Sequence, residues 1–199
     1  MDAPDRGPVG SSPVSAPKLV IGANGYLGSH VTRQLVDDGH DVRVMVRDGA
    51  NTIGIDDLAV TRFVGDIWND EVLRTAMAGC DDVYYCVVDT RGWLKDPAPL
   101  FRTNVEGTRN VLEIAKDIQK DGALQRFIFT SSYVTVGRRR GHTASEEDVI
   151  ADLKSLTPYV RSRVQAENLA SRAADHRVAK VIDESSVRWL QHSTPTRSS

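Results

Sequence analysis

Three glycines spaced three residues apart lie between a short apolar segment and an amphipathic one near the start of the chain. Residues 18–21, KLVI, run directly into GANGYLG, which contains Gly22, Gly25 and Gly28. A helical pattern of apolar residues follows and ends at Gly39. A strand that turns within a few residues into a helix opens a βαβ unit, so this feature predicts an α/β fold with a parallel sheet.

The alternation of strand and helix patterns continues along the chain. Further strands are predicted at 41–47, 60–64, 83–88, 126–130 and 177–182, and helices begin at Asn69 or Asp70 and at Thr157-Pro158. We therefore expect one domain over residues 18–182, with a doubly wound, mostly parallel sheet and helices on both faces. Residues 1–17 are expected to form a flexible leader, and residues 183–199 a disordered tail.

Composition excludes several classes of protein. The 199 residues have a net charge of −2, which gives no general attraction to nucleic acid or to a membrane surface. No segment approaches the roughly 20 apolar residues of a membrane helix. Cys80 and Cys86 are interpreted as buried thiols, and neither they nor the five histidines show metal-ligand spacing. We expect a cytoplasmic protein that binds no metal.

The glycine turn is suited to a dinucleotide. A pyrophosphate must approach backbone N–H groups at the positive end of a helix, where a Cβ atom would block it. Gly22 permits the tight turn, Gly25 the close approach, and Gly28 the close packing of helix on strand. We assign to this site the turn residues Gly22, Asn24, Gly25, Tyr26, Leu27 and Gly28.

The ends of the next two strands bear on which dinucleotide is bound. An arginine at the end of the second strand meets the 2′-phosphate of NADP, whereas a carboxylate meets the 2′-hydroxyl of NAD. Arg47 favours NADP, although Asp48 beside it leaves NAD open and a solvated surface arginine is the alternative interpretation. After the third strand, Asp66 either accepts from the adenine amino group or caps the next turn, with Ile67 beside it.

A candidate catalytic group combines Ser132 with Tyr159 and Arg163. Tyr159 and Arg163 are four residues apart in a predicted helix and share one face. A cation beside a tyrosine favours the phenolate and makes its hydroxyl a usable acid or base. Ser132, which follows the fifth strand, can donate to the same carbonyl oxygen. The alternative is a serine in an ordinary turn and a tyrosine that packs a helix onto the sheet.

Several motifs in this order resemble the extended short-chain dehydrogenase/reductases, the group that includes nucleotide-sugar epimerases, 3β-hydroxysteroid dehydrogenases and dihydroflavonol-type reductases. They are GANGYLG, GDI at 65–67, NVEGTRNVLE at 104–113, FTSSYVTVG at 129–137 and YVRSRVQAE at 159–167. The resemblance implies a Rossmann fold and makes Ser132 and Tyr159 catalytic and Asp66 an adenine contact. With Arg163 lowering the proton affinity of Tyr159 and holding the ribose, the chain would transfer a hydride between NAD(P) and a small carbonyl or alcohol.

Two departures from the family pattern shape this expectation. The family has lysine where this chain has Arg163, and a planar guanidinium differs in shape from a compact ammonium. The C-terminal substrate-binding region of the family is also absent, so the chain is interpreted as truncated and prone to self-association. The alternative to an enzyme is a non-catalytic NAD(P)-binding module. The basic run at 138–140, with His142 nearby, is interpreted as a solvated loop or as a contact for an anionic substrate.

Overall fold

The computed structural model describes residues 16–137, 141, 145, 148, 150, 152–173 and 178–181. Strands and helices alternate along these residues. The strands are β1 (Lys18–Ile21), β2 (Val42–Val46), β3 (Thr61–Val64), β4 (Asp82–Tyr85), β5 (Arg126–Thr130) and β6 (Val178–Val181). The helices are α1 (Tyr26–Asp37), α2 (Asp70–Met77), α3 (Ala98–Phe101), α4 (Thr108–Lys120) and α5 (Pro158–Ala173), with a π-helix η1 (Arg102–Gly107) and a 3-10 turn η2 (Tyr133–Thr135).

The strands form one sheet in the order β3-β2-β1-β4-β5-β6, and every neighbouring pair is parallel. The chain winds outward from β1 to β3, returns to the other side of β1 at β4, and winds outward again. This confirms the doubly wound fold expected from the sequence. The reversal next to β1 is the topological switch point, where ligands bind in open α/β sheets.

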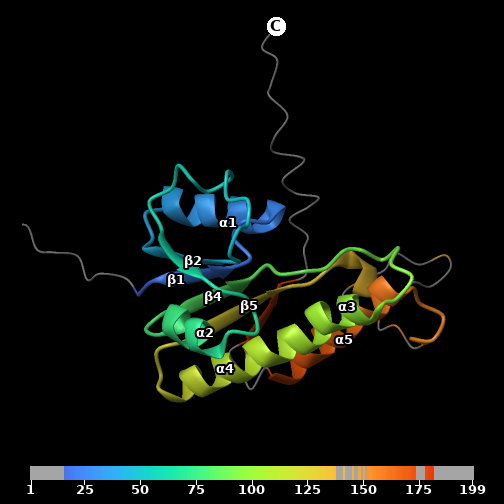
Figure 1. Ribbon diagram of the computed structural model, residues 1–199. Coiled ribbons are helices and arrows are strands. Elements are labelled where there is room, and N and C mark those ends of the chain that lie inside the picture. Colours follow the sequence, from blue (N-terminus) through green and yellow to red (C-terminus); the bar gives the residue numbers. More distant parts are fainter. Residues whose placement is uncertain are drawn as a thin grey trace, which may run out of the picture.

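Helices cover both faces of the sheet (Figure 1). One face packs against α2, α4 and α5 through a cluster that includes Leu73, Val111 and Ala170. The other face lies under α1 and the loop after β2, where Leu35 and Ile55 pack on the valines of β2. The central strands β1 and β4 are almost fully buried between these layers, whereas β3 at the edge of the sheet is mostly exposed.

A buried ion-pair cluster ties together the amino ends of three neighbouring strands. Asp82, at the start of β4, is almost fully buried and receives Lys18 Nζ at 2.6 Å. The same carboxylate accepts from Arg126 Nε at 2.6 Å and Nη2 at 2.5 Å. Burial raises the pKa of Asp82, but the hydrogen bonds from the two cations outweigh it, so the pKa lies below its ordinary value.

Two predicted helix starts are confirmed by capping hydrogen bonds. Asn69 Oδ1 accepts from the Val72 backbone N–H at 3.1 Å, which satisfies one free donor in the first turn of α2. Thr157 Oγ1 accepts from the Val160 N–H at 3.5 Å, and Pro158 occupies the first position of α5.

Candidate functional site

A cavity of about 510 Å³ opens at the carboxyl ends of β1, β2, β3 and β4, at the switch point of the sheet. Six of the residues assigned to cofactor binding line it: Gly22, Asn24, Gly25, Arg47, Asp66 and Ile67. They come from three different loops, each of which follows a strand, so the parallel sheet is what brings them together. Tyr26, Leu27 and Gly28 belong to the adjoining first turn of α1 and do not line the cavity.

The geometry of the glycine turn explains its sequence. Gly22 has a φ of +84°, a conformation that side chains other than glycine rarely adopt. A Cβ atom on Gly28 would lie 2.2 Å from the Gly22 carbonyl oxygen, so only glycine lets α1 approach the turn this closely. Gly25 is the N-cap of α1 in an extended conformation, and a Cβ there would meet only the Gly22 oxygen, at 3.4 Å.

The beginning of α1 is left without a side-chain cap. Among the residues that the structure describes, no side chain caps its first N–H groups, and its first turn contains no acidic residue. Tyr26 and Leu27 contribute their backbone N–H groups here, while the Tyr26 ring is 87% exposed and packs edge-on against His30. The first turn of α1 therefore offers donors and a positive dipole end to an anion.

The loops after β2 and β3 form the adjoining walls of the cavity. Arg47 and Asp48 are both exposed, and only Arg47 lines the cavity. Asp66 Oδ1 accepts from the Trp68 N–H at 2.9 Å, so the turn-capping interpretation of Asp66 is realised. Trp68 also lines the cavity, with the Arg102 guanidinium 5.1 Å from its ring centroid.

The loop after β4 contributes residues that the sequence analysis missed. Asp89, Thr90 and Arg91 line the cavity opposite Arg47. The Asp89 carboxylate is buried and accepts from Arg91 Nε at 2.9 Å and Nη2 at 2.6 Å. These hydrogen bonds hold the pKa of Asp89 below its ordinary value. The position of the loop at the carboxyl edge of the sheet was the signal that could have indicated it.

A buried asparagine fixes this loop to α5. Asn104, in the π-helix η1, accepts from the Asp89 N–H at 2.7 Å and donates to the Asp89 carbonyl at 2.9 Å. Its Nδ2 also donates to Ser162 Oγ at 3.0 Å, and Ser162 Oγ donates to the Tyr159 carbonyl at 2.8 Å. The motif NVEGTRNVLE contains Asn104, but its sequence gives no sign of this bridge.

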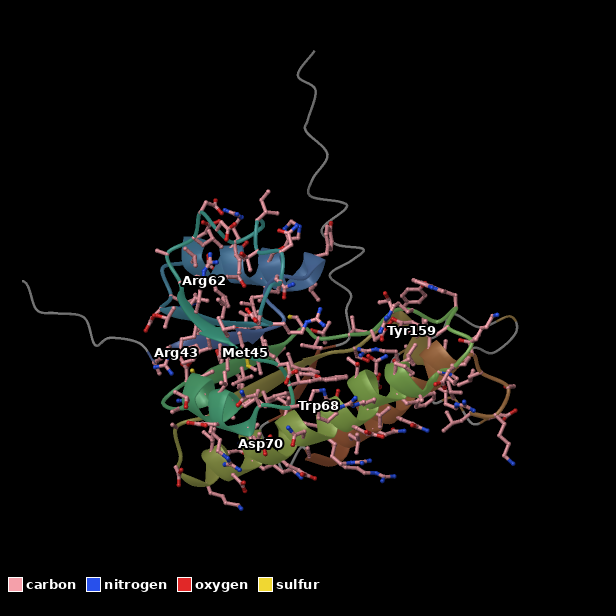
Figure 2. The ribbon with its side chains drawn as sticks, viewed as in Figure 1. Arg43, Met45, Arg62, Trp68, Asp70 and Tyr159 are labelled. Atoms are coloured by element: carbon pink, nitrogen blue, oxygen red, sulfur yellow. The ribbon has the colours of Figure 1, made fainter. Side chains whose placement is uncertain are left out.

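The predicted catalytic residues lie beside the cavity and do not line it. Figure 2 shows Tyr159 at the beginning of α5, apart from Met45 and Trp68, which do line the cavity. The loop after β4 reaches α5. Its Gly92 lies so close to the helix that a Cβ atom added there would be 3.1 Å from Tyr159 Cβ. Ser132 caps η2, with its Oγ 3.5 Å from the Val134 nitrogen, and η2 packs against α5.

Arg163 is buried in the protein interior and does not line the cavity. It is 2% exposed, and its guanidinium lies 5.2 Å from the Phe129 ring centroid. Nη2 donates to the Thr130 carbonyl, whereas Nε and Nη1 are buried and have no hydrogen-bond partner among the described residues. Burial lowers the pKa of this guanidinium, although Tyr159 and Glu167 act in the opposite direction.

Other predicted features fall outside this site. The basic run at 138–140 and His142, like residues 1–15 and the tail at 183–199, lie outside the described residues. Within the described part of the chain, no group of three or more His, Cys, Asp or Glu residues could hold a metal ion. No helix in that part is both long and apolar enough to cross a membrane.

Comparisons with known proteins agree with this fold. Residues 18–182 match the model of the NAD dependent epimerase/dehydratase family. A Synechocystis protein named "Putative dihydroflavonol 4-reductase" is 32% identical over 182 residues, which cover 89% of this chain and 52% of that protein. "Sterol demethylase protein B" of Methylococcus capsulatus is 29% identical, over 75% of this chain and 44% of that protein. The chain thus spans about half the length of the curated relatives it matches.

A solved structure has the same arrangement of strands and helices. The UDP-glucose 4-epimerase of Brucella ovis, solved in complex with NAD, superposes with a TM-score of 0.71 at 23% identity, over 84% of this chain and 51% of the epimerase. At this identity the likeness concerns the fold. The family model, in contrast, matches most of the chain at the level of sequence, and the chain belongs to the NAD dependent epimerase/dehydratase family.

Proposed function

We propose that the chain binds a nicotinamide dinucleotide in the cavity at the switch point and prefers NADP to NAD. The observation that carries this proposal is the glycine turn at the uncapped beginning of α1, which lines the same cavity as Arg47 and Asp66. This surface fits the ligand, because Gly25 lines the cavity, directly precedes α1 and has no side chain to stand between an anion and the first N–H groups of the helix. A volume of about 510 Å³ is also in the range of ligand sites.

Each part of the cavity suits one part of the dinucleotide. The N–H groups of the first turn of α1 would hold the pyrophosphate. Asp66 would accept from the adenine amino group while Ile67 packs on the base, and the Arg47 fork would pair with a 2′-phosphate. When bound, the nicotinamide would supply or accept a hydride. The free thiols fit a reducing compartment, and we place the protein in the cytoplasm on that ground.

We further propose that the chain contributes the proton-transfer half of a carbonyl or alcohol reaction. Tyr159 would donate or accept the proton at the substrate oxygen, and Ser132 would donate a hydrogen bond to that oxygen. Support comes from α5, which is tied through Ser162 and Asn104 to the loop that lines the cavity. The substrate is a small carbonyl or alcohol compound, as the reductase name of one relative suggests.

A non-catalytic dinucleotide-binding protein is the second candidate, and the placement of Arg163 favours it. The Arg163 guanidinium is sealed between α5 and Phe129, and its hydrogen bond among the described residues goes to the Thr130 carbonyl, so Arg163 does not reach the surface of the cavity.

Fluorescence titration with NADPH and NADH tests the cofactor proposal. Arg47→Asp removes the cation and places a carboxylate near the ribose, so NADPH should bind roughly ten- to a hundredfold more weakly and NADH no worse than before. Arg109→Asp is the matched control, since Arg109 is exposed on α4 and does not line the cavity. Equal losses for both dinucleotides would refute the assignment of Arg47. No binding of either dinucleotide to the wild-type chain would refute the proposed function.

Turnover distinguishes the two candidates. NADPH oxidation at 340 nm is followed with a panel of ketones and aldehydes, for the wild-type chain and for Tyr159→Phe. Oxidation by the wild-type chain that is lost in Tyr159→Phe establishes an oxidoreductase in which Tyr159 acts. Dinucleotide binding without oxidation of NADPH on the whole panel establishes the binding protein.

A further inference from the structure

Among the described residues, two arginines provide the positive charge on the wall of the cavity, and they lie on opposite sides of the glycine turn. Arg47 follows β2 and Arg91 follows β4, while the turn itself follows β1. In the sheet, β1 lies between β2 and β4, so the turn separates the two cations. An anion bound on this turn therefore has one arginine on each side of it.

Arg91 is held in place before any ligand arrives. Its Nε and Nη2 donate to the two carboxylate oxygens of Asp89, and its backbone N–H donates to Oδ1 at 3.0 Å. The Asp89 side chain is 6% exposed and the Arg91 side chain 54%, so the pair presents the guanidinium outward. Asn104 fixes the Asp89 backbone through two further hydrogen bonds. Arg91 thus loses little side-chain entropy on contact with a ligand.

The side of the turn on which Arg91 lies tells which part of a dinucleotide it meets. Arg47 and Asp66 follow β2 and β3, on the side proposed for the adenosine half. The loop that carries Arg91 continues into Gly92, which lies against Tyr159 at the beginning of α5. The second half of a dinucleotide that crosses the turn must extend along this loop toward Tyr159.

We propose that Arg91 donates to the nicotinamide-side phosphate of the bound dinucleotide and clamps the pyrophosphate against the first turn of α1. The inference rests on the proposed function. It assigns to the chain a phosphate contact that the glycine turn does not contain. Nη1, which makes no hydrogen bond within the described part of the chain, and the outer N–H of Nη2 are the donors. Arginine presents these two donors in the fork that suits a phosphate group.

Three ligands separate this contact from the others. Adenosine 2′,5′-bisphosphate contains only the adenosine-side phosphate of the pyrophosphate, and 2′-phospho-ADP-ribose contains both phosphates but no nicotinamide. NADPH is the complete ligand. For Arg91→Gln we expect roughly ten- to a hundredfold weaker binding of NADPH and of 2′-phospho-ADP-ribose, and less than about a twofold change for adenosine 2′,5′-bisphosphate. Isothermal titration calorimetry measures all three affinities without any need for turnover.

Lys95→Gln is the matched control, because Lys95 is exposed in the same loop and does not line the cavity. It should leave all three affinities within about twofold. Arg91→Gln removes the cation beside the buried Asp89, so its fold is checked by circular dichroism. If it does not fold, Arg91→Lys replaces it. Arg91→Lys keeps the charge but loses the fork, and it should show the same ligand pattern with a smaller loss.

The other outcomes overturn the proposal in different ways. Unchanged binding of all three ligands makes the Arg91–Asp89 pair a surface ion pair only. Equal losses for all three show a general electrostatic effect, and a loss confined to NADPH places Arg91 at the nicotinamide ring and not at the phosphate. If the wild-type chain binds none of the three ligands, the proposed function itself is refuted. This outcome is distinct from those that concern Arg91.

Discussion

Gly28→Ala should destabilise the fold, although the same change in an ordinary helix position stabilises by about 1 kcal/mol. The new methyl carbon would lie 2.2 Å from the Gly22 oxygen, 2.8 Å from the Gly22 carbonyl carbon and 2.9 Å from Ala23 Cα. Non-bonded carbon atoms settle about 3.5–4.0 Å apart, so α1 or the turn must shift by on the order of 1 Å. All three obstacles are backbone atoms, which no change of rotamer can move.

The magnitude follows from this geometry. Overpacking of a well-packed site costs about 1–3 kcal/mol. The upper end applies here, because the obstructing turn is already held at a φ of +84° by Gly22 and cannot relax toward a common conformation. For a domain of this size, about 3 kcal/mol corresponds to a fall in Tm of roughly 6–12 °C.

Gly25→Ala is the matched comparison, because the same methyl group is added three residues earlier. Its Cβ would meet the Gly22 oxygen at 3.4 Å, an ordinary contact, and its extended backbone accepts alanine. Thermal unfolding followed by circular dichroism should therefore give a Tm close to that of the wild-type chain, with NADPH affinity reduced. Equal Tm values for the two variants would refute the packing argument.

Three further predictions concern stability and reactivity. Because the folded-state pKa of Asp82 lies below its unfolded value of about 4, its contribution to stability is complete above that pH and is lost as the pH falls through the folded pKa. Asp82→Asn should be less stable than the wild-type chain at pH 7 by about 3 kcal/mol. Urea unfolding should show that this difference in stability shrinks as the pH falls, because the other carboxylates with lowered pKa values, such as Asp89, are present in both chains. Arg163→Met removes two buried donors that have no partner among the described residues, together with one hydrogen bond to the Thr130 carbonyl, so Tm should rise or stay level and NADPH affinity should not change. A tenfold weaker affinity would instead show that Arg163 contacts the cofactor. Burial raises the pKa of Cys80 to about 11, whereas Cys86 is half-buried and lines the cavity. Maleimide should therefore label Cys86 alone in the native chain, and the labelling should be slower with NADPH present. A mass spectrum that shows both thiols labelled in the native chain would contradict this.

Much of the fold could be predicted because local signals agree with the sheet. The predicted strand at 126–130 has the bounds of β5, and the Thr157-Pro158 start of α5 is confirmed. The central strand β1 is a short apolar run that two layers of helices cover, so hydrophobicity marks it, whereas β3 at the edge of the sheet is mostly exposed. The predicted strand at 83–88 is longer than β4, because its apolar run continues past Tyr85 into residues that line the cavity.

The candidate site could be predicted only where one short motif builds it. The glycine turn needs no partner from elsewhere, so its spacing suffices. The ion pair of Asp89 and Arg91 lies in a loop whose backbone is held by Asn104 of the π-helix η1, a contact between segments that are 15 residues apart and that no local pattern indicates. Helical spacing also places Arg163 on the face of Tyr159, but it does not tell that the guanidinium turns inward onto Phe129. Self-association stays a prediction.

The central position of β1 has a consequence for synthesis on the ribosome. β1 pairs with β2 after a short connection, but its other neighbour is β4, and the Lys18–Asp82 contact between them spans 64 residues. A nascent chain that has emerged only as far as β3 can assemble β3-β2-β1, with one edge of β1 still bare. An unpaired row of backbone donors and acceptors is a template for aggregation. Translational pausing between residues 64 and 82 should therefore produce the nascent chains that depend most on chaperones.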